Sequence, residues 1–148
     1  MPVLYRIDPS LKLIYYAAFG ICTGVDFLQA EQSAFQHELR RAEMQFIIDV
    51  STAQEVDFGF QDISRAIAFM KERKLQNHKF ERTAVISLSS FAETFVKAYG
   101  LMSESAVELG VFQSMEEAVK WLGLSESIAR VLQIKNSLAD EFQKQHSG

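Results

Sequence analysis

The stretch Met44-Gln45-Phe46-Ile47-Ile48-Asp49-Val50 decides the fold class of this chain. Its short, mostly apolar run predicts a strand. A helical pattern precedes it over residues 24–40, with Thr23 as the N-cap and Asp26 at the third helical position. A second helical pattern follows the strand, with Asp62 as its N-cap. Strands that alternate with helices in this way predict a mostly parallel sheet covered by helices.

The same alternation continues on both sides of this unit. Two strands at 3–8 and 11–20 are separated only by a turn at Asp8-Pro9-Ser10, which predicts an antiparallel hairpin. Two more strands are expected at 81–87 and 107–112. The expected fold is therefore a single α/β domain with a mixed, mostly parallel five-stranded sheet, an N-terminal antiparallel hairpin and covering helices.

Three further segments complete the expected elements. Ser90 with Glu93 predicts the capping box of a third helix, and a short helix is expected from Ser114 to residue 123. Residues 51–60 are expected to form a loop, the longest irregular stretch of the chain.

The last 25 residues, 124–148, predict an extra amphipathic helix with a polar tail, outside a main unit at 3–123. Its apolar residues fall at helical spacing, and Lys135 interrupts their stripe. A short amphipathic helix is only marginally stable alone in water, so its apolar face needs a partner surface. That surface is either the chain's own sheet or a second copy, which would make a homodimer through this C-terminal helix.

Composition narrows the class of protein without naming an activity. The chain has 148 residues, of which 48% are hydrophobic and 23% charged, which is typical of one soluble globular domain. A net charge of −4 gives no attraction to nucleic acid. No apolar run approaches the roughly 20 residues of a transmembrane segment. The single cysteine, Cys22, excludes an internal disulfide and favours a cytoplasmic setting, with the thiol buried and inert.

Catalytic motifs are missing from the sequence. The three histidines are far apart and have no second His or Cys at metal-ligand spacing. No phosphate-binding glycine loop, nucleophile elbow or dinucleotide fingerprint occurs. We therefore expect no cofactor, no metal and no catalytic residue.

The order of elements resembles the STAS domain, the fold of bacterial anti-sigma-factor antagonists and of the cytoplasmic tails of sulfate transporters. More narrowly, the chain is similar to SpoIIAA-like bacterial proteins of unknown function. The resemblance rests on the opening hairpin at 5–15, on Phe46-Ile47-Ile48-Asp49-Val50 with its polar loop, and on the ending at 111–123. It implies a STAS-like fold and a role in binding another protein.

One departure from that family limits what the resemblance implies. Anti-sigma-factor antagonists carry an Asp-Ser-Ser-Gly-like segment at the start of the helix after this strand, and its serine is phosphorylated. Here the comparable segment is Gln54-Glu55-Val56-Asp57-Phe58-Gly59-Phe60-Gln61-Asp62. It has no hydroxyl at the helix start, so the phospho-switch does not carry over to this chain.

Several polar residues near strand ends are candidates for contact with a ligand or partner. Ser51 and Thr52 follow the central strand, and Ser89 and Ser90 follow the next one. Hydroxyls in these places bind an anion or simply satisfy turn and cap backbone groups. Asp57 belongs to the same set, and together with Asp49 and Asp62 it would make a carboxylate site if the three converged.

Three functions follow as hypotheses. The first is a non-catalytic STAS-like regulatory module that binds another protein. The second is a small-ligand or lipid-binding module, because STAS-like proteins of this kind are grouped with the CRAL-TRIO lipid-transfer fold and the chain has 12 phenylalanines. The third is an enzyme that uses the carboxylates after the central strand. A surface patch, an apolar cavity or convergent aspartates would distinguish them.

Overall fold

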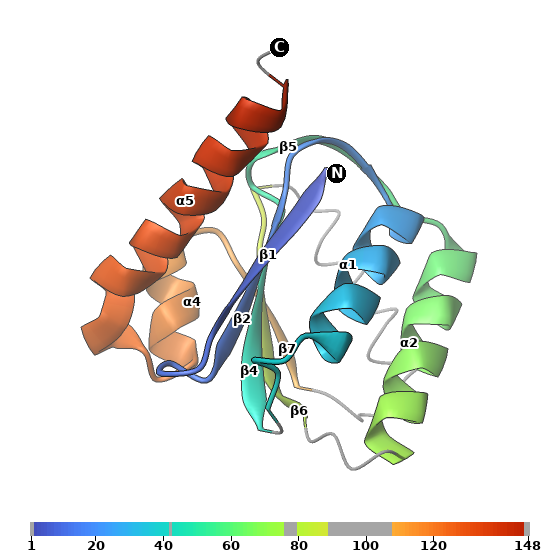
Figure 1. Cartoon of the computed structure of the whole chain (residues 1–148), viewed down its shortest axis with the longest axis horizontal. Coiled ribbons are helices and arrows are strands. Elements are labelled where there is room, and N and C mark those ends of the chain that lie inside the picture. The colour runs from blue at the N-terminus through green and yellow to red at the C-terminus, as the bar shows by residue number, and fades with distance from the viewer. Residues whose placement is uncertain (1, 42, 76–79, 89–107, 147–148) are drawn as a thin grey trace.

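The computed structural model describes residues 2–41, 43–75, 80–88 and 108–146 (Figure 1). The strands are β1 (Val3–Asp8), β2 (Leu13–Ala18), β3 (Gly20–Thr23), β4 (Met44–Asp49), β5 (Ala53–Asp57), β6 (Phe80–Ile86) and β7 (Leu109–Phe112). The helices are α1 (Gly24–Gln36), α2 (Phe60–Leu75), α4 (Met115–Trp121) and α5 (Ile128–His146), with a short 3₁₀ turn, η1 (Ser125–Ser127), before α5.

The main sheet has five strands in the order β1-β2-β4-β6-β7. β1 and β2 form the antiparallel hairpin, in which Ile7 lies opposite Ile14. The pairs β2–β4, β4–β6 and β6–β7 are all parallel. The mixed, mostly parallel five-stranded sheet expected from the sequence is therefore confirmed.

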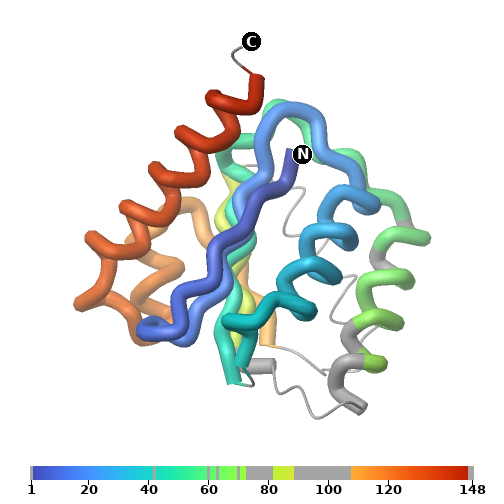
Figure 2. The backbone as a smooth tube through the Cα atoms, in the orientation of Figure 1, coloured from blue at the N-terminus to red at the C-terminus, as the bar shows by residue number. Residues whose placement is uncertain are grey.

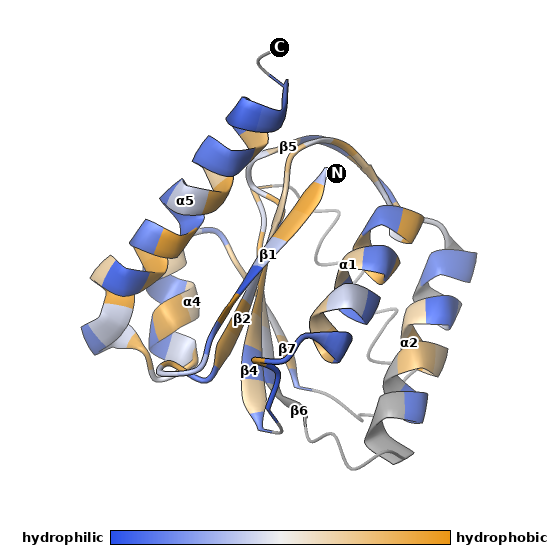
Figure 3. Ribbon diagram, in the orientation of Figure 1, coloured by the Kyte–Doolittle hydropathy of each residue, from blue (hydrophilic) through white to orange (hydrophobic). Residues whose placement is uncertain are grey.

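Helices cover both faces of this sheet. Figure 1 shows α1 and α2 on one side and α4 and α5 on the other. Side chains alternate along β2: Tyr15 faces the α5 side and Tyr16 faces the α1 side. Figure 3 shows predominantly hydrophobic strands between helices whose outward surfaces are hydrophilic.

The apolar face of α5 packs against its own chain. Val131, Ile134 and Leu138 are buried in the same core as β2, β4 and α4. Phe142 stacks on Phe19 with ring centroids 4.7 Å apart. Of the two surfaces considered for this helix, the structure places it on the chain's own sheet.

Two helix starts follow the predicted capping chemistry. Thr23 caps α1 in a capping box, because its Oγ1 accepts the Asp26 N–H and the Asp26 carboxylate accepts the Thr23 N–H. Ser114 caps α4 by accepting the Glu117 N–H. The third helix predicted from Ser90, and part of the strand predicted at 107–112, lie outside the described residues.

The prediction of a loop over residues 51–60 is wrong for most of this segment. It contains β5, which pairs in parallel with β3 in a separate two-stranded sheet. Figure 2 shows these two segments, far apart in sequence, running side by side. The second strand, expected over 11–20, is correspondingly divided into β2 and β3 at Phe19, and Gly20 has a positive φ of 62°. Such a pairing depends on long-range contact and leaves little local signal.

The ends of α1 and α2 also differ from the prediction. α1 stops at Gln36, because the backbone of His37 is extended and its Nδ1 accepts the Leu39 N–H. Arg40 and Arg41 therefore lie in the following loop and not in the last helical turn. α2 begins at Phe60, ahead of Asp62. Asp62 caps the helix from within its first turn, where it accepts the N–H of Gly59 at 2.7 Å.

Three ion pairs attach α5 to the sheet. Arg130 pairs with Asp8 at 3.0 Å, and Glu141 pairs with Arg6 at 2.8 Å. Lys135 pairs at 3.3 Å with Asp49, which is fully buried at the end of β4. Lys135 interrupts the apolar stripe of the helix because it lies above this carboxylate.

The Asp49–Lys135 pair gives a stability prediction. Substitution of Lys135 by Met leaves a buried carboxylate without its cation, which is strongly destabilising. Because Lys135 is itself partly exposed, we expect a loss of about 1–3 kcal/mol in the free energy of unfolding. Urea denaturation measures this loss. The matched control Lys144→Met, on an exposed turn of the same helix, should change stability by less than about 0.5 kcal/mol; equal effects of the two would contradict a role for the pair.

Candidate functional site

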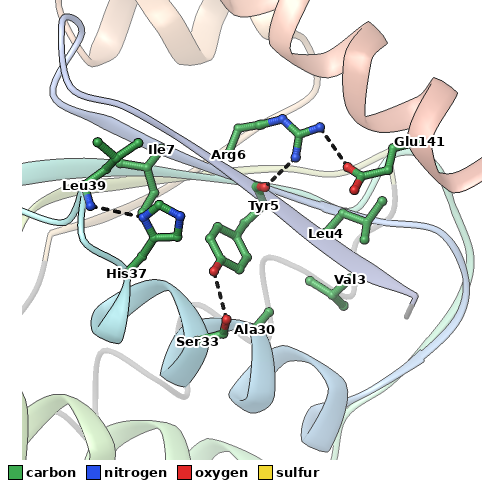
Figure 4. Close-up of a pocket in the computed structure, with 10 residues that line it drawn as sticks. All are labelled: Val3, Leu4, Tyr5, Arg6, Ile7, Ala30, Ser33, His37, Leu39 and Glu141. Atoms are coloured by element: carbon green, nitrogen blue, oxygen red, sulfur yellow. Dashed lines mark hydrogen bonds and ion pairs between the residues drawn. The ribbon is translucent and has the colours of Figure 1, made fainter.

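A groove of about 330 Å³ lies along the outer edge of β1, between α1 and α5 (Figure 4). β1 is the first strand of the sheet, and among the described strands it pairs with β2 alone. Its residues form the floor, and residues of α1, of the following loop and of α5 form the walls. The lining residues are Val3, Leu4, Tyr5, Arg6, Ile7, Ala30, Ser33, His37, Leu39 and Glu141.

The pairing of β1 determines which backbone groups face this groove. In an antiparallel pair, opposite residues alternate between hydrogen-bonded and non-bonded pairs. The Phe19 N–H donates to the Pro2 carbonyl, so Pro2 and Phe19 form a hydrogen-bonded pair. Every second residue after Pro2 forms the same kind of pair, and the even-numbered residues of β1 therefore direct their backbone groups to β2. The odd-numbered residues Val3, Tyr5 and Ile7 direct theirs outward. Val3 is almost fully buried, whereas Tyr5 and Ile7 are partly exposed.

The polar side chains around the groove bind one another. The Tyr5 hydroxyl lies 2.8 Å from the Ser33 hydroxyl, and its ring meets the His37 ring edge-on. Arg6 donates to the outward carbonyl of Tyr5 at 3.2 Å and also pairs with Glu141. Figure 4 shows Arg6 and Leu4 on the α5 side of β1, and Tyr5, Val3 and Ile7 on the α1 side. The arrangement presents an apolar floor with backbone hydrogen-bonding groups.

The hydroxyls predicted after the central strand take part in local structure. Ser51 donates from its hydroxyl and its N–H to Asp49 Oδ1, at 2.6 and 3.0 Å. Thr52 donates to the carbonyl of Ala18 at 2.7 Å. The Tyr15 hydroxyl donates to the other oxygen of Asp49 at 2.5 Å. Burial, together with this carboxylate, raises the pKa of Tyr15 far above its ordinary value. These bonds join β2, β4 and the turn into β5 under α5.

The three aspartates considered as a carboxylate site do not converge. Asp49 faces α5 and is fully buried. Asp57 is exposed at the end of β5, opposite Thr23. Asp62 lies at the start of α2 against Gly24 of α1, so close that a side chain at Gly24 would collide with it. Within the described residues, no three His, Cys, Asp or Glu side chains are grouped to hold a metal ion.

The remaining candidates from the sequence are the hydroxyls of Ser89 and Ser90 and the thiol of Cys22. Ser89 and Ser90 lie outside the described residues. Cys22 is buried and its thiol donates to the Phe19 carbonyl at 3.1 Å; burial raises the pKa of this thiol to about 11. A thiol with so high a pKa stays protonated at neutral pH and is a poor nucleophile. Among the helices in the described part of the chain, none has the length and apolar character needed to cross a membrane.

Sequence reasoning did not identify the groove residues or Arg40. The helix predicted over residues 24–40 places Arg40 in its last turn, whereas in the structure only 7% of Arg40 is exposed. Lys135 did give a signal, because a charge within an apolar stripe indicates a buried partner. No comparable local signal marks Tyr5, Ser33 and His37, which come together only through the packing of α1 on β1.

Comparison with solved structures finds an uncharacterized protein of the DUF3478 family with a SpoIIAA-like fold, from Shewanella loihica PV-4. The match has a TM-score of 0.53 and 19% sequence identity, and it covers 81% of this chain and 93% of that one. No family model and no curated protein matches this chain. Together with the sheet topology, this likeness shows that the chain has a SpoIIAA-like fold, as its resemblance to STAS domains implies.

Glu31 of α1, on the same side of the sheet as Tyr16, gives a pH prediction. Burial raises the pKa of its carboxyl from 4.5 to about 7. Between these values the folded protein holds a proton that the unfolded chain has released, so the contribution of Glu31 to stability falls as pH rises through this range. Substitution of Glu31 by Gln should leave stability at pH 4 nearly unchanged and increase it at pH 8.

Urea denaturation at a series of pH values tests this prediction. The control is Glu38→Gln, which removes an exposed carboxyl in the loop after α1 and should change stability by less than about 0.5 kcal/mol. A Glu31→Gln profile parallel to that of the unmodified chain would show that Glu31 titrates at its ordinary pKa.

Proposed function

We propose that this protein is a non-catalytic interaction module that binds an extended segment of a partner protein in the groove along β1. The observation that carries the proposal is the outward direction of the Tyr5 and Ile7 backbone groups on the floor of that groove. A strand edge recognises a peptide through such main-chain groups, while side pockets select alternate side chains. The SpoIIAA-like fold is compatible with this role, and STAS domains are the resemblance that suggests it.

The groove along β1 limits the length and the chemistry of the segment that can bind there. The outward carbonyl of Tyr5 already accepts a hydrogen bond from the Arg6 side chain. Of the outward backbone groups of Tyr5 and Ile7, the Tyr5 N–H and the N–H and carbonyl of Ile7 therefore remain for a partner strand. Val3 is covered, which limits pairing to a few residues. Arg6 and Glu141 neutralise each other on the α5 wall. These features favour a short, extended, largely apolar segment over a long strand of a second copy.

Peptide display on the full-length protein tests the proposal. Short peptides selected on the unmodified chain should lose affinity about tenfold or more for Ile7→Pro, which removes an outward N–H. Ile7 makes no ladder bond to β2 through this N–H, so proline is tolerated there. The control Ile7→Val keeps the N–H and most of the side chain, and it should bind almost as the unmodified chain does.

Two results would count against this function. One is that selected peptides bind Ile7→Pro as tightly as Ile7→Val, while circular dichroism shows both variants folded. The other is that the peptides shift amide resonances of α4 or α2 and leave those of β1 unchanged. Either result would place the interaction surface elsewhere on the molecule.

A further inference from the structure

The loop between α1 and β4 carries a buried arginine without a hydrogen-bonding partner. Arg40 is only 7% exposed, and its Nε, Nη1 and Nη2 are all buried. Within the described residues none of these three nitrogens has a hydrogen-bond acceptor, and no carboxylate forms an ion pair with them. Buried charges in proteins are normally paired, because an unpaired one has lost its hydration without replacement.

Two aromatic rings lie against this guanidinium. Its central carbon lies 4.7 Å from the centroid of the Phe35 ring and 5.8 Å from that of Phe46. Phe35 also meets Phe69 edge-on, at 5.5 Å. Rings attract the face of a guanidinium, but they offer no acceptor to the N–H groups at its edge. The aromatic contacts therefore hold Arg40 in place and leave its hydrogen-bonding capacity unused.

The Tyr16 hydroxyl is a second unpaired donor, and the Tyr16 ring lies beside Phe46, which also contacts Arg40. Tyr16 is 2% exposed and its hydroxyl is buried without a partner among the described residues. The Tyr16 ring stacks on Phe46, with centroids 6.4 Å apart and planes 17° from parallel. Burial is the main cause that raises the pKa of Tyr16 and lowers that of Arg40. Tyr16 also interacts electrostatically with the Glu31 carboxyl and, to a smaller extent, with Arg40.

We propose that Arg40 and Tyr16 form a binding site for a small monocarboxylate with an apolar body. A guanidinium edge binds a carboxylate through two parallel N–H···O bonds, and the tyrosine hydroxyl can donate to the same group. One positive charge matches one carboxylate, whereas a phosphate dianion would bring a second, uncompensated charge. The rings of Phe35, Phe46 and Phe69 favour an apolar body behind the carboxylate.

The residues around this site differ in their exposure to solvent. Leu39 and Arg41, on either side of Arg40 in the chain, are exposed. Tyr16 and Phe46 lie on adjacent central strands and are almost fully buried. The site is separate from the groove along β1, whose lining includes neither Arg40 nor Tyr16, and the proposal does not depend on the function proposed for that groove.

Benzoate is a suitable probe, because it joins one carboxylate to one aromatic ring. Isothermal titration of the full-length protein with sodium benzoate, at constant ionic strength, should show saturable binding at one site. Arg40→Met should weaken it about 10- to 100-fold, the loss expected for a charged bidentate hydrogen bond. The control Arg65→Met removes an exposed arginine on α2 and should bind as the unmodified chain does.

Tyr16→Phe tests the site without removing a charge, and it keeps the stacked ring. It should weaken benzoate binding about tenfold or more, the usual contribution of a hydrogen bond to a charged group. This variant decides the matter if Arg40→Met does not fold. Matching chemical-shift changes at Phe35 and Phe46 on addition of benzoate would support the same location.

Several outcomes would overturn the proposal. One is the absence of saturable benzoate binding at millimolar concentration. A second is binding that survives both Arg40→Met and Tyr16→Phe, which would place it elsewhere. A third is a preference for inorganic phosphate over benzoate, which would contradict the ligand class. Failure here leaves peptide binding at β1 untouched, because Ile7→Pro reports on that groove alone.

Discussion

The handedness of the strand crossovers determines how the rest of this molecule is built. Parallel strands joined by right-handed crossovers that advance in one direction place every crossover helix on the same face. The order β2-β4-β6-β7 advances in this way, and α1 and α2 lie on one face of the sheet. The opposite face of β2 and β4 is just as apolar, so elements after the last strand must cover it. α4 and α5 do so, which makes α5 an integral part of the core.

The covering of this second face combines apolar packing with charge. Val131, Ile134 and Leu138 provide the apolar contact, while ion pairs to Asp8 and Asp49 fix the helix in register. Burial alone would raise the pKa of Asp8, but hydrogen bonds from Ser10, Arg130 and the Leu11 N–H together lower it. The helix is thus held to the hairpin turn at one end and to the end of β4 further along. The hydroxyls of Ser51 and Tyr15 also donate hydrogen bonds to Asp49. These bonds explain why both hydroxyls point toward Asp49, and no ligand is needed to account for it.

Sequence patterns predicted what depends on local chemistry. The capping box at Thr23, the hairpin turn after Asp8 and the apolar run of β4 each act within a few residues, and each is confirmed. Features that depend on distant packing were missed. The β3–β5 pair has no local signature, and Arg40 follows a helix whose end is set by the extended backbone of His37. The groove along β1 likewise exists only because α1 and α5 pack on either side of an edge strand.

The two proposed surfaces are joined by one row of rings. Tyr5, which lines the groove, lies directly opposite Tyr16 on β2, with ring centroids 6.1 Å apart. Tyr16 stacks in turn on Phe46, which contacts Arg40. Contact alone is not coupling, which requires an element with two arrangements that both ligands bias. The loop after α1 borders both surfaces, because His37 and Leu39 line the groove while Arg40 lies against the Phe35 ring.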